Sequence, residues 1–365
     1  MRRLESLTVK NFKSIRDQTL QLASLNIFIG GNGSGKSNLI EVFRFLREIV
    51  NQNLAGYTAR KGGADALLHF GRKTSPTMEV SVKFSHSLLP QSSNAYLVKL
   101  TGTNEDQLVI EYETALFHDK TYQRPYGHAV AQYTTESKLR DDDHITARQI
   151  LEDLEGYWVY HFHDTSDSAP LKATNEIDDN RFLRPQAENL AAFLYWLQEK
   201  HPGHMANIRD TIRQIAPFFD RFQLAPLRLN PSKIKLEWQE KGTDSYFNAS
   251  AMSDGTLRFI CLATLLLQPN LPPLVLLDEP ELGLHPAAIT LLANLLASAA
   301  TRTQVIVATQ SVTLVNQFEP AQVWTVDRAG HESVFRHLTV AGMTGWLEDY
   351  ALGELWEKNV LGARP

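Results

Sequence analysis

The stretch Asn26–Asn38 reads NIFIGGNGSGKSN. A short apolar run over residues 27–29 leads into residues 30–37, which match the phosphate-binding pattern G-x-x-x-x-G-K-[ST]. Glycines let such a loop curl so that its backbone N–H groups point at phosphate oxygens, and the positive end of the following helix faces the same anion. Apolar residues then recur with helical spacing at positions 39, 40, 42, 43 and 45. This context favours a nucleotide site over a glycine-rich turn that binds nothing.

The polar side chains of this loop have predictable roles. Lys36 is placed to reach the β- and γ-phosphates, and the Ser37 hydroxyl is placed to bind Mg²⁺. We therefore expect ATP and Mg²⁺ as cofactors. The expected nucleotide-binding residues belong to the loop and the helix start: Gly30, Asn32, Gly33, Ser34, Gly35, Lys36, Ser37 and Asn38.

An acidic pair supplies the second half of the predicted site. Residues 274–277 (LVLL) form a buried-strand pattern that ends in Asp278 and Glu279. We expect Asp278 to hold Mg²⁺ and Glu279 to act as the general base that polarises the attacking water. Such a pair alone would be interpreted as an acidic strand end at the surface. The phosphate-binding loop makes that interpretation the less favoured one.

Three further motifs resemble a known family. Residues 253–256 read SDGT before an apolar helix, residues 276–286 read LLDEPELGLHP, and residues 7–15 read LTVKNFKSI. With the phosphate-binding loop, their order resembles the ABC-type ATPase heads of the RecF, SMC and OLD group. More narrowly, it is similar to the small bacterial predicted ATPases labelled as AAA family. The resemblance covers about residues 1–50 and 250–315, and the middle of the chain matches only loosely.

The resemblance implies that the signature segment acts on a second subunit. In such heads, Ser253, Asp254 and Gly255 would bind the γ-phosphate held by the partner. Because the chain has one phosphate-binding loop and one signature, a homodimer with two ATP molecules at its interface is expected. The loop at residues 281–285 would line the seam of that dimer. His285 has a second interpretation, as a turn residue before a proline that starts a helix.

Two positions depart from the family pattern. Gln310 stands where many ABC ATPases have a switch histidine, and we include it among the catalytic residues with Glu279 and Lys36. A glutamine can orient water or bind the γ-phosphate, but it cannot take up a proton. At the end of the strand pattern over residues 158–164 the family has a glutamine that touches Mg²⁺. Here His163 or Asp164 is the predicted substitute, and a zinc site is disfavoured because cysteine partners and a third ligand are lacking.

The predicted fold class is α/β: a P-loop NTPase with an ABC-ATPase head, in which a mixed sheet has an antiparallel β flank and an inserted helical lobe. The expected divisions are residues 1–165 (loop and β flank), 166–270 (helical and signature lobe), 271–340 (acidic pair and switch strand) and 341–365 (a helical tail packed on the domain). Flank strands are expected at residues 78–84, 95–100 and 107–113, a short strand at 20–25, and a polar loop over 122–145.

Composition narrows the class of protein. The 365 residues are 43% hydrophobic and 21% charged, which is typical of a globular protein. The net charge of −5 gives no general attraction to nucleic acid. Five basic residues are candidates for a local cationic surface, although an ordinary solvated face is favoured: Arg209, Arg213, Arg221, Lys233 and Lys235. Neither a secretory signal nor a membrane span is expected, so we predict a cytoplasmic protein without a membrane partner.

These features support two functional hypotheses. The first is an ATP-hydrolysing molecular switch that acts in DNA transactions or antiphage defence, by analogy with the family. The second is a scaffold that binds ATP, dimerises and recruits a partner with little turnover. About 50 residues follow Gln310, too few for the TOPRIM nuclease domain of OLD proteins, so any cleavage is expected from a separate effector. A transporter subunit is disfavoured because the signature differs from L-S-G-G-Q, and DNA binding stays open.

Overall fold

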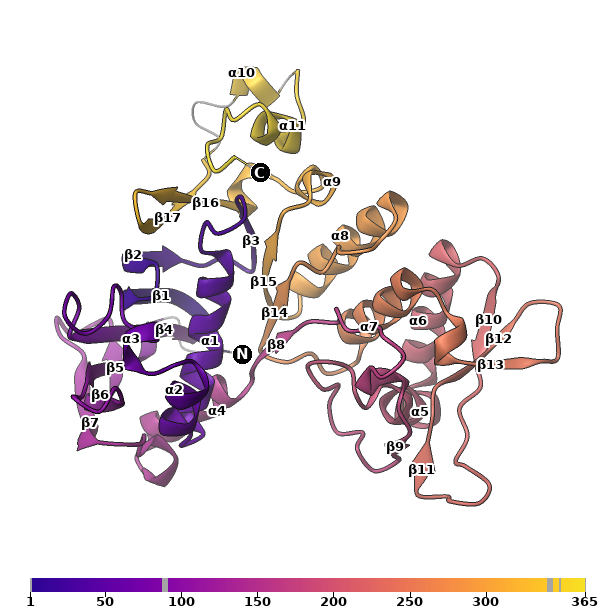
Figure 1. Cartoon of the computed structure of the whole chain (residues 1–365), viewed down its shortest axis with the longest axis horizontal. Helices are drawn as coiled ribbons and strands as arrows, with labels where there is room; N and C mark the ends of the chain where they lie inside the picture. Colours follow the sequence, from indigo (N-terminus) through magenta and orange to yellow (C-terminus); the bar gives the residue numbers. More distant parts are fainter. Residues whose placement is uncertain (1, 87–90, 340–343, 348, 365) are drawn as a thin grey trace.

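The computed structural model describes residues 2–86, 91–339, 344–347 and 349–364. Figure 1 shows two lobes joined at the centre. The first lobe, at the left, holds β1–β7 and α1–α4, and the second lobe, at the right, holds α5–α7 and β9–β13. Strands β8, β14 and β15 lie between them, and the C-terminal segment lies at the top.

A six-stranded central sheet carries the sequence motifs, in the order β17-β16-β3-β15-β14-β8. Its strands are β3 (Leu25–Ile29), β8 (Tyr157–Tyr160), β14 (Leu274–Asp278), β15 (Gln304–Thr309), β16 (Val323–Ala329) and β17 (Glu332–His337). All neighbours pair in parallel except β16 and β17. Leu276 of β14 packs into one hydrophobic core and Leu277 into the other. Burial on both faces explains why these strands read as continuous apolar runs.

A second six-stranded sheet, in the order β2-β1-β4-β5-β6-β7, forms the antiparallel flank. Its strands are β1 (Arg2–Phe12), β2 (Ile15–Gln21), β4 (Thr77–His86), β5 (Ser92–Gly102), β6 (Leu108–Asp119) and β7 (Tyr126–Thr134). The three predicted flank strands are confirmed as β4, β5 and β6. The mixed α/β head with its flank is thus the fold class that the sequence predicted.

Two local predictions in this region are wrong. Residues 126–134 form β7, although the sequence predicted a polar loop over 122–145. An edge strand with mostly exposed side chains lacks the apolar alternation on which the prediction depended. The strand expected at residues 20–25 ends instead at Gln21, and β3 begins at Leu25. The side chain of Asn26 closes the turn between them, because it bonds the backbone N–H and carbonyl of Ala23.

The helices lie on both sides of the central sheet (Figure 1). In the first lobe these are α1 (Lys36–Val50), α2 (Leu54–Arg60), α3 (Ala64–Leu67) and α4 (Ile145–Glu155). In the second lobe they are α5 (Leu190–Lys200), α6 (Pro202–Ile215) and α7 (Asp254–Leu267), and α8 (Pro286–Ala300) and α9 (Val312–Val315) follow. Helix α7 buries nine of its side chains, which accounts for its apolar sequence.

The second lobe contains strands as well as helices. Its short strands are β9 (Asn175–Glu176), β10 (Phe219–Phe222), β11 (Lys233–Ile234), β12 (Glu237–Glu240) and β13 (Tyr246–Asn248). Strand β12 pairs with both β10 and β13, and β9 pairs with β11. Trp238 of β12 is buried between Phe219 and Phe247, so this small sheet has an aromatic core of its own.

The C-terminal tail contains α10 (Thr344–Leu347) and α11 (Leu352–Glu357). Leu355 and Trp356 are fully buried, and the backbone N–H of Gly353 bonds the side chain of Asn316, next to α9. Residues 341–343, 348 and 365 of the predicted tail lie outside the described residues. None of the described helices is long and apolar enough to cross a membrane.

Candidate functional site

The predicted motifs lie at one edge of the central sheet. Parallel strands place their carboxyl ends together, and ligands of such sheets bind at that edge. The register sets Ala308 of β15 between Phe28 of β3 and Asp278 of β14. As a result, the phosphate-binding loop after β3, the acidic pair at the end of β14 and Gln310 after β15 become neighbours.

The phosphate-binding loop is tightly folded around Lys36. The Lys36 ammonium group donates to the backbone carbonyls of Gly30 (2.5 Å) and Gly31 (3.1 Å). The side chain is only 5% exposed, and burial lowers the pKa of Lys36. Gly33 and Gly35 have left-handed backbones, with φ of 73° and 115°. The loop is therefore preformed. To bind a phosphate, Lys36 would leave the two carbonyls to which it now donates.

A chain of side-chain hydrogen bonds holds the loop from outside. Ser333 of β17 bonds the backbone carbonyl of Ser34 (2.6 Å) and the hydroxyl of Ser14 (2.6 Å). Asn38 of α1 donates to Ser14 (2.7 Å). A Cβ atom on Gly35 would lie 2.0 Å from the Ser333 hydroxyl, so no larger residue fits there. The NFKS segment of the first hairpin thus supports the loop through Ser14, and sequence reasoning missed Ser333.

Glu279 and Gln310 face the loop from the neighbouring strands. Glu279 has a left-handed backbone (φ 45°), and its N–H continues the sheet ladder to Ala308 (2.8 Å). The Gln310 amide donates to the Glu279 carboxylate and to Asn32 of the loop (3.0 Å). Thus, Gln310 bridges the predicted general base and the phosphate-binding loop.

These residues line one pocket of about 150 Å³. Its lining residues are Asn32, Gly33, Ser34, Gly35, Lys36, Ser37, Asn38, Glu279 and Gln310. Gly30, the first residue of the loop, is not among them, and its carbonyl accepts a hydrogen bond from Lys36. Asp278 lines a smaller adjoining pocket with His161, His163 and Arg258. The structure therefore gathers the predicted loop residues, general base and switch residue, with the predicted metal ligand next to them.

The donor set fits Mg²⁺. This ion prefers hard oxygen ligands, and Ser37 and Asp278 offer a hydroxyl and a carboxylate. Burial, followed by the negative charge of Glu279, raises the pKa of Asp278. Among the residues that the structure describes, none donates a hydrogen bond to the Asp278 carboxylate. A bound cation would supply the missing positive partner.

Glu281, which was expected at the dimer seam, points into its own chain. It is 9% exposed, and its Oε1 accepts hydrogen bonds from the Thr309 hydroxyl (2.5 Å) and from the backbone N–H of Gln310 (3.3 Å). Its Oε2 is buried without a partner. Burial raises the pKa of Glu281. The neighbouring His285 is exposed and caps α8, accepting from the N–H of Ala287, so its turn role is present.

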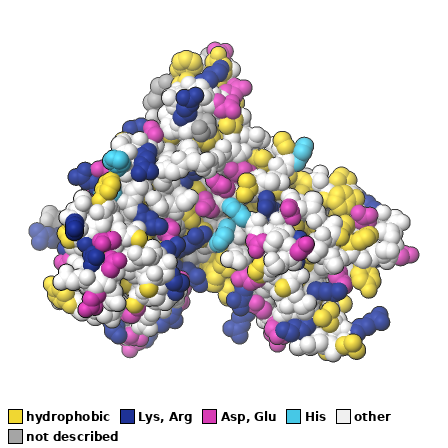
Figure 2. All heavy atoms as spheres, in the orientation of Figure 1, with side chains coloured by type: hydrophobic (Ala, Val, Ile, Leu, Met, Phe, Trp, Pro, Cys, Tyr) yellow, Lys and Arg dark blue, Asp and Glu magenta, His cyan; other side chains and the backbone are white. Residues whose placement is uncertain are grey.

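The structure separates the two candidates for the family's metal-touching glutamine. His163 bonds the backbone carbonyl of Asp278 through its Nε2 (2.9 Å). Asp164 is exposed and only closes a turn with Ser166. His161 lies 3.5 Å from Arg44 of α1, and burial, followed by the charge of Arg44, lowers the pKa of His161. Figure 2 shows histidine side chains at the surface where the two lobes meet.

The signature residues lie at the start of α7, outside the loop pocket. Ser253 caps the helix by accepting from the N–H of Thr256 (3.3 Å), and it is exposed, as is Asp254. One turn further, Arg258 donates to the backbone carbonyls of Leu282 and His163, each at 2.9 Å. Arg258 therefore connects the signature helix to the segment after β8 and to the segment after β14. Sequence reasoning missed this role.

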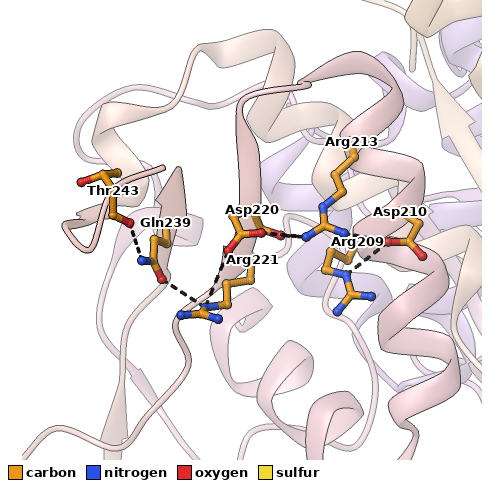
Figure 3. Close-up of polar contacts among 7 residues, drawn as sticks. All are labelled: Arg209, Asp210, Arg213, Asp220, Arg221, Gln239 and Thr243. Carbon is orange, nitrogen blue, oxygen red and sulfur yellow. Dashed lines mark hydrogen bonds and ion pairs between the residues drawn. The ribbon is translucent and has the colours of Figure 1, made fainter. Parts of the chain in front are cut away.

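The candidate cationic surface is neutralised by neighbouring carboxylates. Figure 3 shows Arg213 between Asp210 and Asp220, with Arg209 next to Asp210 and Arg221 next to Asp220. Arg213 bonds Asp220 at 2.9 Å and Asp210 at 3.2 Å. Lys233 and Lys235, further on, pair with Glu176 and Glu237. This supports the solvated face that the sequence favoured over a free cationic groove.

The acidic loop at residues 141–144 forms a helix cap. Asp142 accepts from the backbone N–H of His144 (2.8 Å), and His144 caps α4 through Thr146. Over the described part of the chain, no group of three or more histidine, cysteine or acidic side chains is arranged to hold a metal ion.

Comparison with known proteins places this site in a family. Residues 25–316, more than half of the chain, match the family described as "AAA domain, putative AbiEii toxin, Type IV TA system". The chain belongs to this AAA-domain family. The match spans the phosphate-binding loop, the signature, the acidic pair and Gln310. No protein with a curated description matched the chain.

The fold is shared with solved SMC head domains. The Smc head bound to the C-winged helix domain of ScpA shares 19% identity with this AAA-domain chain at a TM-score of 0.59, covering 94% of this chain and 99% of that one. The head with an extended coiled coil bound to the C-terminal domain of ScpA, from Pyrococcus furiosus, shares 18% at 0.59, covering 96% and 99%. The head with a coiled coil and joint from Pyrococcus yayanosii shares 11% at 0.55, covering 96% and 99%. The fold is that of an ABC-type ATPase head of the SMC and RecF group.

Proposed function

We propose that this AAA-domain protein binds ATP with Mg²⁺, hydrolyses it, and uses the cycle as a molecular switch. The observation that carries the proposal is the pocket in which the phosphate-binding loop, Glu279 and Gln310 meet. Both the family and the fold are those of nucleotide-binding proteins. A pocket that combines a phosphate cradle with a carboxylate facing it is arranged for water attack on a phosphate.

Each residue has a distinct role in this proposal. Lys36 exchanges the carbonyls of Gly30 and Gly31 for phosphate oxygens, whose negative charge favours its protonated form. Ser37 and Asp278 would hold Mg²⁺, which supplies charge neutralisation at the phosphates when bound. Glu279 orients and deprotonates the attacking water. Gln310 fixes the position of the Glu279 carboxylate through its amide donor.

The second subunit is a further part of the proposal. Ser253, Asp254 and Gly255 do not line the loop pocket of their own chain, and the first two are exposed at the start of α7. A second copy that presents this helix start to the γ-phosphate would complete the site with backbone N–H donors. ATP would then stabilise a homodimer, and hydrolysis would loosen it. In this proposal, residues 1–165 and 271–340 bind the nucleotide, residues 166–270 carry the signature, and residues 341–365 are the tail, whose helix α11 packs against α9.

The second candidate is an ATP-dependent scaffold with slow turnover. The residue at the switch position favours it, because Gln310 cannot take up a proton as the histidine of many ABC ATPases can. Both candidates leave the downstream action to a separate effector, such as a nuclease. The description of the family as a putative toxin of a type IV system supports a role in antiphage defence over DNA repair.

Phosphate release separates these two functions. Wild type with Mg²⁺ and ATP should release phosphate, and Lys36→Ala should not, because the phosphates lose their main positive partner. Chelation of Mg²⁺ should stop release in wild type. A wild type that binds ATP tightly and releases no phosphate would favour the scaffold. DNA added at several salt concentrations would show whether a nucleic acid accelerates turnover, since phosphate contacts weaken steeply with salt.

A further inference from the structure

Three left-handed residues other than glycine converge beside the phosphate-binding loop. They are Asn11 (φ 58°) and Lys13 (φ 49°) of the NFKS turn, and Phe70 (φ 57°) after α3. His69 joins them: its N–H bonds the carbonyl of Asn11 (3.0 Å), and its Nδ1 bonds the carbonyl of Lys13 (2.6 Å). Strain of this kind costs on the order of 1–3 kcal/mol per residue and concentrates at binding sites. For a bulky aromatic residue, a left-handed backbone is a genuine outlier.

The strained backbone presents an aromatic ring to solvent. Phe70 is 58% exposed, whereas His69 beneath it is buried. The Phe70 ring packs edge-on against His69 (4.5 Å between ring centroids) and His331 (5.6 Å). The two histidines fix the ring in place and leave most of it uncovered. An exposed, immobilised aromatic ring is a platform for another flat ring.

The platform is tied to the phosphate-binding loop. His331 lies in the turn between β16 and β17, and both ends of that turn contact the loop. Arg328 approaches the carbonyl of Gly33 (3.4 Å), and Ser333 bonds the carbonyl of Ser34 (2.6 Å). On the other side, Lys13 precedes Ser14, which bonds Asn38 of the loop helix. His331 thus belongs to a turn whose two ends contact the phosphate cradle, and His69 bonds the carbonyl of Lys13, the residue before Ser14.

We propose that Phe70, held by His69 and His331, is the seat for the purine base of the nucleotide whose phosphates bind the loop. This inference rests on the proposed nucleotide site and assigns its base. Stacking recognises a flat, neutral ring and does not depend on the phosphates. Phe70 is accordingly a specificity-determining residue, and affinity for the base and affinity for the phosphates are separable.

Calorimetric titration of the full chain with Mg²⁺-ADP and with Mg²⁺-tripolyphosphate tests this. Tripolyphosphate offers the phosphates without a base. Phe70→Ala should weaken ADP binding about tenfold, in the range of lost base–aromatic stacking, and leave tripolyphosphate binding unchanged. The matched control is Tyr133→Ala, because Tyr133 is an 80% exposed aromatic with a left-handed backbone (φ 50°) on the edge strand β7. This control should bind both ligands as wild type does.

A second variant guards against loss of folding. Phe70→Trp keeps a stacking ring, so it should retain ADP affinity and gain a fluorescence quench with ADP that tripolyphosphate does not produce. Equal weakening of both ligands in Phe70→Ala, or undiminished ADP binding, would overturn the base seat while the nucleotide site stands. The same holds for a Phe70→Trp protein that binds ADP without a quench. A wild type that binds neither ligand would overturn the proposed function and the base seat together.

Discussion

The side-chain amide of Gln310 donates to the carboxylate of Glu279 and to Asn32 (3.0 Å), which joins the proposed general base to the phosphate-binding loop. The backbone of Gln310 is held as well, because its N–H donates to the buried Glu281. Gln310 therefore donates hydrogen bonds to two carboxylates of the DEPE segment, to Glu279 from its side chain and to Glu281 from its backbone. Since an amide cannot accept the proton, Gln310 acts on hydrolysis by positioning Glu279.

Gln310→Ala should lower kcat by about a hundredfold, which is the usual loss when one positioned hydrogen-bond donor is removed from an active site. Affinity for ADP should stay near the wild-type value, because the loop contacts remain. Gln310→His keeps a donor and is the matched control, with most of the turnover expected to remain. Phosphate release and ADP titration are the two measurements. Equal kcat in Gln310→Ala and wild type would show that Glu279 needs no such donor.

Glu281 should make stability fall as pH rises. Burial raises its pKa above the ordinary 4.5, so the folded protein holds this proton better than the unfolded chain does. The stabilisation is complete below pH 4.5 and is lost as pH rises through the pKa of the folded state. Glu281→Gln removes this titration and keeps an acceptor for Thr309, so its stability relative to wild type should improve from pH 4 to pH 8. Urea denaturation at both pH values measures the difference.

The control at this position is Glu281→Leu. It leaves the Thr309 hydroxyl and the N–H of Gln310 without an acceptor, and an unsatisfied buried group of this kind costs about 2 kcal/mol. Glu281→Leu should therefore be less stable than Glu281→Gln by about that amount at any pH. If the leucine and glutamine variants are equally stable, the two hydrogen bonds contribute nothing to folding.

Glu41 of α1 should show the opposite pH dependence. Burial alone would raise its pKa, but hydrogen bonds from Lys61, Tyr57 (2.6 Å) and Lys13 (3.1 Å) lower it to about 2. A carboxylate with a depressed pKa stabilises the fold above its ordinary pKa of 4.5, and this stabilisation is lost as pH falls toward 2. Glu41→Gln should cost about 3 kcal/mol at pH 7 and much less at pH 3. A cost that is the same at both pH values would contradict this.

Two glycines of the phosphate-binding loop should respond differently to alanine. Gly35→Ala should abolish ADP binding or folding, because the added Cβ would meet the Ser333 hydroxyl at 2.0 Å. A Cβ atom on Gly33 would meet nothing within 4 Å, so only the strain of its left-handed backbone (φ 73°) remains. That strain costs about 1 kcal/mol, or a few-fold in affinity if it falls on the binding conformation. Circular dichroism and ADP titration compare the two variants. Equal losses of folding or of ADP affinity in both would show that the contact with Ser333 does not determine the effect.

The parts of the site that could be predicted are those in which the functional residues directly follow their strand in the sequence. The loop and the pair Asp278–Glu279 each follow a buried strand, so a short stretch contained both the strand and the chemistry. Gln310 follows a third strand, and the parallel order of the sheet brings it to the same edge. Periodicity and strand ends predict the loop and the acidic pair, whereas the resemblance to ABC-type heads is what points to Gln310.

The supporting contacts could not be anticipated, because they join distant segments. Ser14 and Ser333 are 319 positions apart, and nothing in the pattern of either segment signals their bond. Arg258 looks like an ordinary polar residue of an apolar helix until the fold places it under the carbonyls of Leu282 and His163. For Glu281, the expectation from the sequence differs from the structure. The resemblance places its loop at a dimer seam, whereas Glu281 points inward and accepts hydrogen bonds from Thr309 and Gln310.

Light scattering combined with phosphate release, for wild type and Glu279→Gln with and without Mg²⁺-ATP, tests the central claim most directly. Glu279→Gln keeps the loop and the signature and removes the general base. ATP should convert this variant into a stable dimer, whereas wild type should release phosphate and return to the monomer. A Glu279→Gln protein that binds ATP and remains monomeric, beside a wild type that releases no phosphate, would contradict the ATP-driven switch.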